Sequence, residues 1–132
     1  MAGYSIVIQR VDSTTPHIPR WHLDFPSNSQ SIEGSELAQD GLLFQGWLLN
    51  EGKSAASLVI LNGDEVLEIP IERARPDVVS RVLKQDPENH DLLLCGFSER
   101  IKLKHSSFTL GLIQDGKFVE LMNGNIEGKF LN

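Results

Sequence analysis

The chain has 132 residues, 40% of them hydrophobic, which is enough for one domain with a real core and too apolar for wholesale disorder. Its 18 acidic and 12 basic residues give a formal net charge of -6, which argues against nucleic acid or an anionic membrane surface as a partner. The single cysteine excludes an intrachain disulfide. We therefore expect one soluble domain over residues 1–132.

The start of the chain carries no recognisable targeting signal. Residues 1–10 contain no basic segment followed by an apolar run, so we expect no signal peptide. The longest apolar runs, Leu58 to Leu61 and Leu92 to Cys95, are too short to cross a bilayer, and no membrane association is expected. One unpaired cysteine fits a reducing compartment, and we expect a cytoplasmic location.

The first part of the chain predicts strands joined by polar connections. Residues 4–11 are rich in β-branched side chains, which favour a strand. Trp21, Leu23 and Phe25 alternate with polar residues, which predicts a strand with one buried face. Residues 26–36 are polar and predict a loop with a short strand around residues 31–32. The apolar segment 41–49 predicts the next strand.

The second part predicts two hairpins and a strand between them. Asn62-Gly63-Asp64 joins residues 57–61 to residues 65–71, and Asp115-Gly116 joins residues 108–114 to residues 117–122. Such turn residues accept a positive φ angle between two apolar runs. Residues 97–104 alternate, with Phe97, Ile101 and Leu103 on the inward face. The Gly-rich residues 123–132 are expected to fray after the last short strand.

Only one segment has helical character. Pro76 suits the first position of a helix, and the apolar residues at 78, 79, 82 and 83 form a helical stripe. Asp86-Pro87 should end it. We expect one short helical turn near residues 76–84 that crosses from one sheet to the other.

Short strands at this spacing, with turn signals throughout, predict an all-β fold. The predicted architecture is an antiparallel β-sandwich, Ig-like in its arrangement, with a small closed barrel as the alternative. A sandwich leaves edge strands that invite pairing, so a homodimer through an edge is a further expectation.

No residue pattern points to catalysis. Cys95 lies within an apolar run, where a buried structural thiol is expected, and no serine stands in a nucleophile elbow. The four histidines are scattered without metal-ligand spacing, and no glycine-rich phosphate loop is present. We therefore expect no enzyme activity, no catalytic residue, no metal and no cofactor.

The aromatic residues offer the chemistry of sugar binding. Trp21 and Trp47 are candidates, because sugars bind flat aromatic faces beside hydrogen-bonding groups. The alternation around Trp21 and the apolar surroundings of Trp47 favour core packing as the alternative for both. His22, next to Trp21, is included as a candidate ligand-binding residue.

Four short motifs occur in a recognisable order: Gln45-Gly46-Trp47, Asn62-Gly63, Arg75-Pro76-Asp77-Val78 and Gly96-Phe97. In this order, over about residues 41–115, the chain resembles an all-β accessory domain that is typically joined to bacterial glycosyltransferases, methyltransferases and sulfotransferases of cell-surface polysaccharides. The Arg-Pro-Asp-Val block is the most specific part of the resemblance, which does not extend to residues 1–40.

The resemblance implies a non-catalytic module that binds an oligosaccharide or positions a catalytic glycosyltransferase or sulfotransferase domain. Arg75 and Asp77 then have two readings. They either build a structural crossover, with Arg75 paired to Asp77 or to an acid on a neighbouring loop, or they offer a bidentate hydrogen-bonding site for sugar. The alternative function is a protein–protein interaction module without sugar affinity, which an exposed apolar patch would favour.

Overall fold

A computed structural model describes residues 3–11, 19–50 and 56–128, and its strands dominate this part of the chain. The elements follow one another in the order β1 (Gly3–Arg10), β2 (Arg20–Phe25), β3 (Gln30–Glu33), α1 (Gly34–Gln39), β4 (Leu42–Leu49), β5 (Ala56–Asn62), β6 (Glu65–Ile69), α2 (Pro76–Arg81), β7 (Gly96–Ile101), β8 (Ser107–Gln114) and β9 (Lys117–Gly128).

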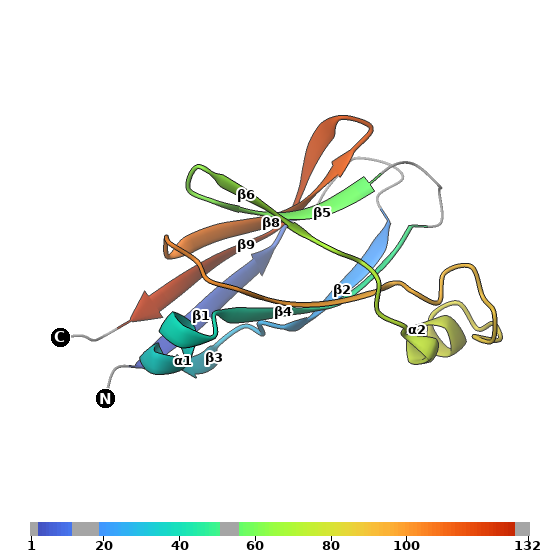
Figure 1. The fold of residues 1–132 in the computed structure, drawn as a ribbon, viewed down its shortest axis with the longest axis horizontal. Coiled ribbons are helices and arrows are strands. Elements are labelled where there is room, and N and C mark those ends of the chain that lie inside the picture. Colours follow the sequence, from blue (N-terminus) through green and yellow to red (C-terminus); the bar gives the residue numbers. More distant parts are fainter. Residues whose placement is uncertain (1–2, 12–18, 51–55, 129–132) are drawn as a thin grey trace.

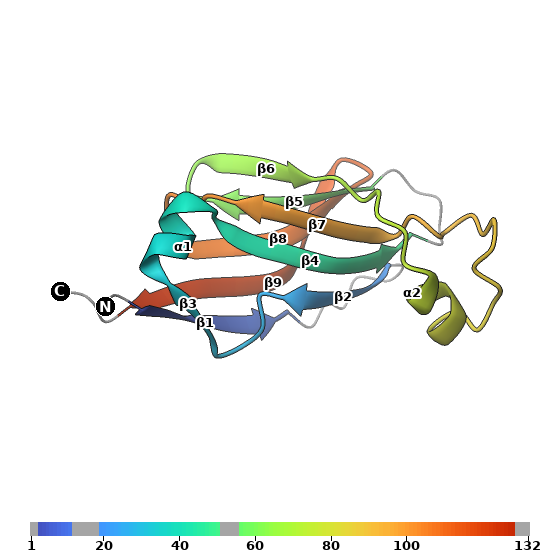
Figure 2. The ribbon, with the colours of Figure 1, turned by 60° about the horizontal axis from the view of Figure 1, so that its bottom comes forward.

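The strands form two separate antiparallel sheets packed face to face (Figure 1). The larger sheet has six strands in the order β3-β1-β9-β8-β5-β6, and the smaller has three in the order β2-β4-β7. Figure 2 shows the small sheet in front of the large one, with α2 at one end. The all-β, antiparallel sandwich is therefore confirmed, and the closed barrel is wrong because the chain makes two sheets.

The main core lies between the sheets. Its residues come from alternating positions of the facing strands, as expected for antiparallel sheets with one buried face. At its centre, the ring of Phe44 on β4 meets the ring of Phe108 on β8 edge to face, with centroids 5.4 Å apart. Both rings are nearly inaccessible to solvent, and they join the two sheets at this point.

A second, smaller cluster holds α2 on the outer face of the small sheet. Val78 from α2 packs against Leu49 of β4 and the thiol-bearing Cys95, which is 3% exposed. Trp47 lies at the margin of this cluster. The crossing helical turn after Pro76 is confirmed, but it is shorter than predicted. The reason is that Lys84 adopts a left-handed backbone, with φ of 56°, before Asp86-Pro87 is reached.

Both predicted hairpins are present. Gly63 has a φ of 62°, and Asp115 and Gly116 both have positive φ, as two-residue turns between antiparallel strands require. Asn62 itself is the last residue of β5 and is fully buried. Its amide donates to the carbonyl oxygens of His105 and Ser107, and its Oδ1 accepts from the backbone N–H groups of Lys104 and His105.

Two sequence predictions are wrong at segment ends. Residues 34–39 form α1, where a loop was predicted through residue 36. Leu37 of this short helix packs against the main core, and Gly41, with φ of 86°, follows its C-terminus. Strand β9 continues to Gly128 instead of ending at residue 122, because its last seven residues pair with β1. The polar side chains of residues 123–128 face outward, and they obscure the alternation that would predict a strand in the sequence.

The alternation in β2 is also interrupted. The register with β4 shifts between Leu23 and Phe25, so Phe25 does not continue the inward face of Trp21 and Leu23. Phe25 is 41% exposed, and the predicted burial of this ring is wrong. In β7, Phe97 and Ile101 are buried as predicted, whereas Leu103 lies beyond the end of the strand. Within the described residues no helix is long and apolar enough to cross a membrane.

Candidate functional site

Arg75 stands at the N-terminus of α2 and ties this helix to the small sheet. Its Nη1 donates to the carboxylate of Asp24 on β2 at 3.1 Å and lies 3.5 Å from the carbonyl oxygen of Gly46 on β4. Asp24 in turn lies 3.4 Å from Nε2 of His22, two residues earlier on the same outward face. A single guanidinium therefore connects the helix to two neighbouring strands.

The same guanidinium binds Asp77 through two parallel hydrogen bonds. Nε donates to Oδ1 and Nη2 donates to Oδ2, both at 3.0 Å. Planar, bidentate pairing of this kind is the strongest form of the arginine–carboxylate interaction. The groups that one of the two alternatives directs at a sugar thus face each other, which favours the other alternative, a structural crossover, for the Arg-Pro-Asp-Val block. A ligand-binding role for Arg75 and Asp77 stays a prediction.

Charge pairing sets the protonation of this network. The hydrogen bond from Arg75 holds the pKa of Asp77 below its usual value. The carboxylates of Asp77 and then Asp24 raise the pKa of Arg75 above its already high value, against the effect of burial. The pair is fully ionised at neutral pH, and it stabilises the start of α2, where Asp77 also meets the positive end of the helix dipole.

We expect Asp77→Asn to lower the free energy of unfolding by less than about 1 kcal/mol at pH 7, because the Asp77 side chain is 49% exposed and solvent screens the pair. The folded pKa lies below the ordinary value of 3.8, so the contribution is present above that value and is lost as the pH falls through the folded pKa. Urea denaturation at pH 7 and again below pH 3.8 measures the difference. Asp64→Asn, at an exposed turn, is the matched control, and a pH-independent cost of Asp77→Asn would contradict the ion-pair account.

Trp21 lies in a different setting, at a hollow of about 260 Å³ between β1 and β2. Ile8, Leu23 and Met122 form apolar walls, and Arg10 and Asn28 bring polar groups to the hollow, whereas the imidazole of His22 lies near Asp24 on the outward face of β2. Small-molecule sites have this composition, with an apolar lining and a few polar groups. We name this site the Trp21 hollow.

Arg10 covers the indole of Trp21. Its guanidinium carbon lies 3.9 Å from the ring centroid, which is a cation–π contact. At an exposed position such a contact contributes only about 0.5–1 kcal/mol, so a ligand can displace Arg10 at small cost. Asn28 also has a structural role. Its Oδ1 accepts a hydrogen bond from the backbone N–H of Ile8 at 2.9 Å, which holds residues 26–29 against β1.

The other candidates of the sequence are held in the small cluster around α2. Trp47 is half-buried there, with its ring centroid 6.1 Å from that of His22. Burial raises the pKa of the Cys95 thiol, as expected for a structural cysteine. Among the described residues no group of three or more His, Cys, Asp or Glu side chains is placed to hold a metal ion.

The predicted site residues form two groups that meet at His22: the Arg75–Asp77 pair on the outer face of the small sheet, and Trp21 at its edge. Sequence reasoning missed Arg10 and Asn28. Arg10 ends a strand, and Asn28 lies in a uniformly polar segment, so neither carries a local signal. No family model matches the chain, and no curated protein or solved structure matches it.

Proposed function

We propose that this chain is a non-catalytic accessory module of a bacterial polysaccharide-modifying enzyme, with an Ig-like sandwich that binds glycan in the Trp21 hollow. The observation that carries the proposal is the indole of Trp21 beside the polar groups of Arg10 and Asn28 in one concave site. An apolar ring face takes the C–H side of a sugar, and the polar groups take its hydroxyls.

The resemblance to accessory domains supports the class of partner. It implies a neighbouring glycosyltransferase or sulfotransferase domain, and we propose a cytoplasmic location from the single cysteine of the chain. The Arg75–Asp77–Asp24 network supports a rigid frame rather than a reaction centre, because the guanidinium is bound by two carboxylates of the fold itself.

Replacing Trp21 with alanine should weaken the binding of uncharged oligosaccharides at least about tenfold, equivalent to ~1.4 kcal/mol, because the stacking face is lost. Trp47→Phe is the matched control and should leave affinity unchanged. Because the chain has two tryptophans, this variant keeps Trp21 alone, and the fluorescence of the protein then reports only on the Trp21 hollow. The measurement is a fluorescence titration, repeated as an amide chemical-shift titration.

Trp21→Phe keeps a smaller ring in the core and guards against misfolding of the alanine variant. It should retain binding at a few-fold lower affinity. Saturable shifts around Trp21 in the wild type support the proposal. Their absence at millimolar sugar contradicts it.

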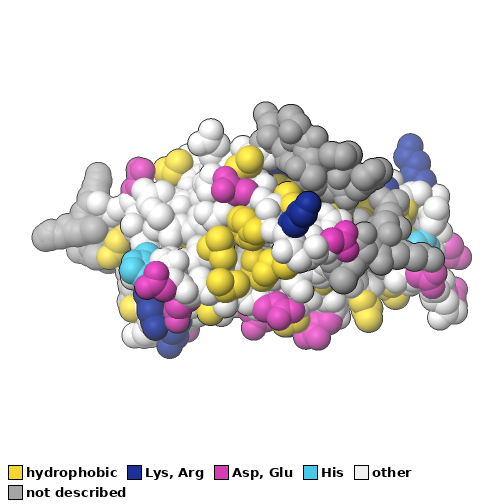
Figure 3. Space-filling model, turned by 90° about the horizontal axis from the view of Figure 1, so that it is seen from above, with side chains coloured by type: hydrophobic (Ala, Val, Ile, Leu, Met, Phe, Trp, Pro, Cys, Tyr) yellow, Lys and Arg dark blue, Asp and Glu magenta, His cyan; other side chains and the backbone are white. Residues whose placement is uncertain are grey.

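A protein–protein interaction module is the second candidate, and one surface favours it. Val66, Ile113 and Phe118 are 59%, 38% and 41% exposed on the outer face of the large sheet. Figure 3 shows hydrophobic side chains gathered in the middle of this face. Exposed apolar patches commonly mark protein contacts. Loss of sugar binding together with capture of an adjoining catalytic domain on this patch would favour the second function.

A further inference from the structure

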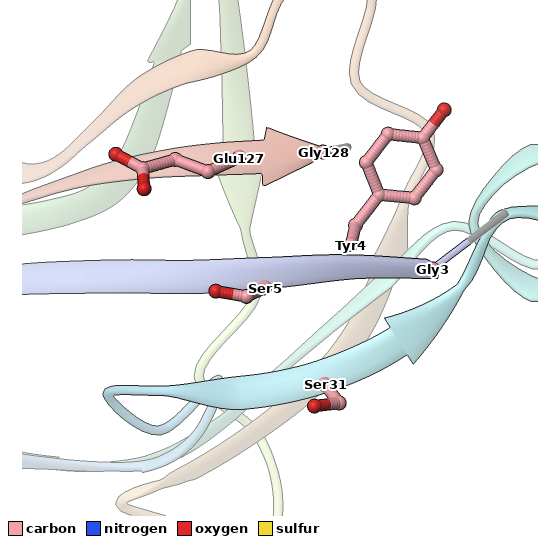
Figure 4. Close-up of a pocket in the computed structure, with 6 residues that line it drawn as sticks. All are labelled: Gly3, Tyr4, Ser5, Ser31, Glu127 and Gly128. Atoms are coloured by element: carbon pink, nitrogen blue, oxygen red, sulfur yellow. The ribbon is translucent and has the colours of Figure 1, made fainter. Parts of the chain in front are cut away.

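The outer face of the large sheet carries two adjoining hollows away from the Trp21 hollow. One, of about 420 Å³, is lined by residues of β1, β3 and β9, among them Ser5, Ser31 and Glu127 (Figure 4). The other, of about 350 Å³, is lined by β1, β8 and β9, among them Val7, Gln9 and Asn125. We name the two together the β1–β9 trough.

Strand register places the two hollows next to each other. Ser5 pairs with Glu127 and Val7 pairs with Asn125 on the same two strands, so the hollows adjoin with no element between them. From Ser5 to Gln9 the trough extends roughly 13 Å at about 3.3 Å per residue, which is longer than one sugar ring. In Figure 3 a broad pale area of uncharged polar side chains and backbone lies beside the central apolar patch on this face.

The polar side chains of the trough are held in two similar units. In one, Asn123 accepts from the hydroxyl of Thr109 at 2.9 Å and donates to the carboxylate of Glu120 at 2.8 Å. In the other, Asn125 accepts from the hydroxyl of Ser107 at 3.1 Å and donates to Glu127 at 3.3 Å. These bonds fix the direction of both amides before any ligand arrives, which lowers the entropy cost of binding.

Hydrogen-bonding capacity remains after these contacts. Each amide keeps a second N–H, and each carboxylate keeps further lone pairs. The trough therefore offers both donors and acceptors, which suits hydroxyl groups, since a hydroxyl donates and accepts at once. Val7, 40% exposed at the centre, offers an apolar contact. Among the described residues, no lysine or arginine lines either hollow, and Glu127 adds negative charge, which favours an uncharged ligand over an anionic one.

From this we infer that the β1–β9 trough is a second binding surface, which takes an extended, uncharged, polyhydroxylated chain such as a neutral glycan. The inference rests on the proposed function for its ligand class and differs from it in the site. The Trp21 hollow accepts one sugar face through an aromatic ring. The trough accepts successive units of a chain through amide, hydroxyl and carboxylate groups.

The test is a titration of the ¹⁵N-labelled full chain with linear, uncharged glucose oligosaccharides. The side-chain amide resonances of Asn123 and Asn125 should shift in a saturable manner. The double change Asn123→Ala and Asn125→Ala should lower the affinity of the trough at least about tenfold. Ser5→Leu, which fills the junction of the hollows and leaves both Asn units intact, should do the same. Asn28→Ala, the same change in the Trp21 hollow, is the matched control and should leave the trough resonances responsive.

The outcomes separate the two sites. One result is that chemical-shift changes are confined to residues around Trp21, with loss in Asn28→Ala and retention in Ser5→Leu. That result would contradict binding in the trough and would leave the proposed function intact. No shift at either site would overturn both. Tighter binding of sulfated oligosaccharides in the trough would overturn the uncharged ligand class.

Discussion

Replacing Asn62 with alanine should lower the free energy of unfolding by about 3 kcal/mol, one of the two largest effects expected for this chain. Asn62 is fully buried and uses both ends of its amide on the backbone of residues 104–107. The alanine variant would leave two carbonyl oxygens and two N–H groups of that segment without these partners. Urea denaturation of both proteins at one pH measures the effect.

Asn125→Ala is the matched control for this change, because Asn125 lies on the outward face of β9, where water replaces a lost hydrogen bond. Its cost should stay below about 1 kcal/mol. Asn62→Asp keeps the two acceptor contacts but puts a buried carboxylate oxygen against the carbonyl oxygens of His105 and Ser107, so it should cost at least as much as Asn62→Ala. If Asn62→Ala lowered the free energy of unfolding no more than Asn125→Ala, the hydrogen bonds of Asn62 would not be what stabilises the connection between β7 and β8.

Gly46→Ala should have an effect of similar size, about 3 kcal/mol, through overpacking. A methyl group at Gly46 would collide with the backbone carbonyl oxygen of His22 and lie 3.0 Å from the Cα of Leu23. Both obstacles are backbone atoms of β2, so no side-chain rotation relieves the contact. The strand has to move away, and the Trp21 hollow with it.

Denaturation measures the stability of this variant, and the fluorescence of Trp21 in a Trp47→Phe background measures the position of β2. We expect a loss of stability together with a changed Trp21 spectrum. Gly3→Ala is the matched control, since nothing lies within 4 Å of the added carbon there. Normal stability of Gly46→Ala would show that β2 packs less closely on β4 than the structure indicates.

The sequence predicts the elements that local chemistry decides. Turn residues predict both hairpins, and Pro76 with Asp77 predicts the start of α2, because these signals act over a few residues. Strand β9 is predicted too short, because part of the pairing that extends it comes from β1, more than a hundred residues earlier. Helix α1 is missed, because six residues in a polar segment carry too little periodicity.

The candidate site divides in the same way. The Arg75–Asp77 pair spans two residues and is predicted as one of two alternatives. The contact from Arg75 to Asp24 spans 51 residues and depends on how α2 returns to β2. The Trp21 hollow exists only because β1 and β2, from different sheets, meet at one edge. Such long-range placement leaves no local pattern for sequence reasoning to detect.

The pairing of β1 with β9 has a mechanical consequence. Gly3 and Gly128 lie at the same end of the two antiparallel strands (Figure 1). A force that draws these ends apart loads the hydrogen-bonded pairs one after another from Tyr4–Gly128, so the strands open like a zipper instead of resisting together in shear. A polymer bound across the β1–β9 trough would contact both strands and would raise the force needed to separate them.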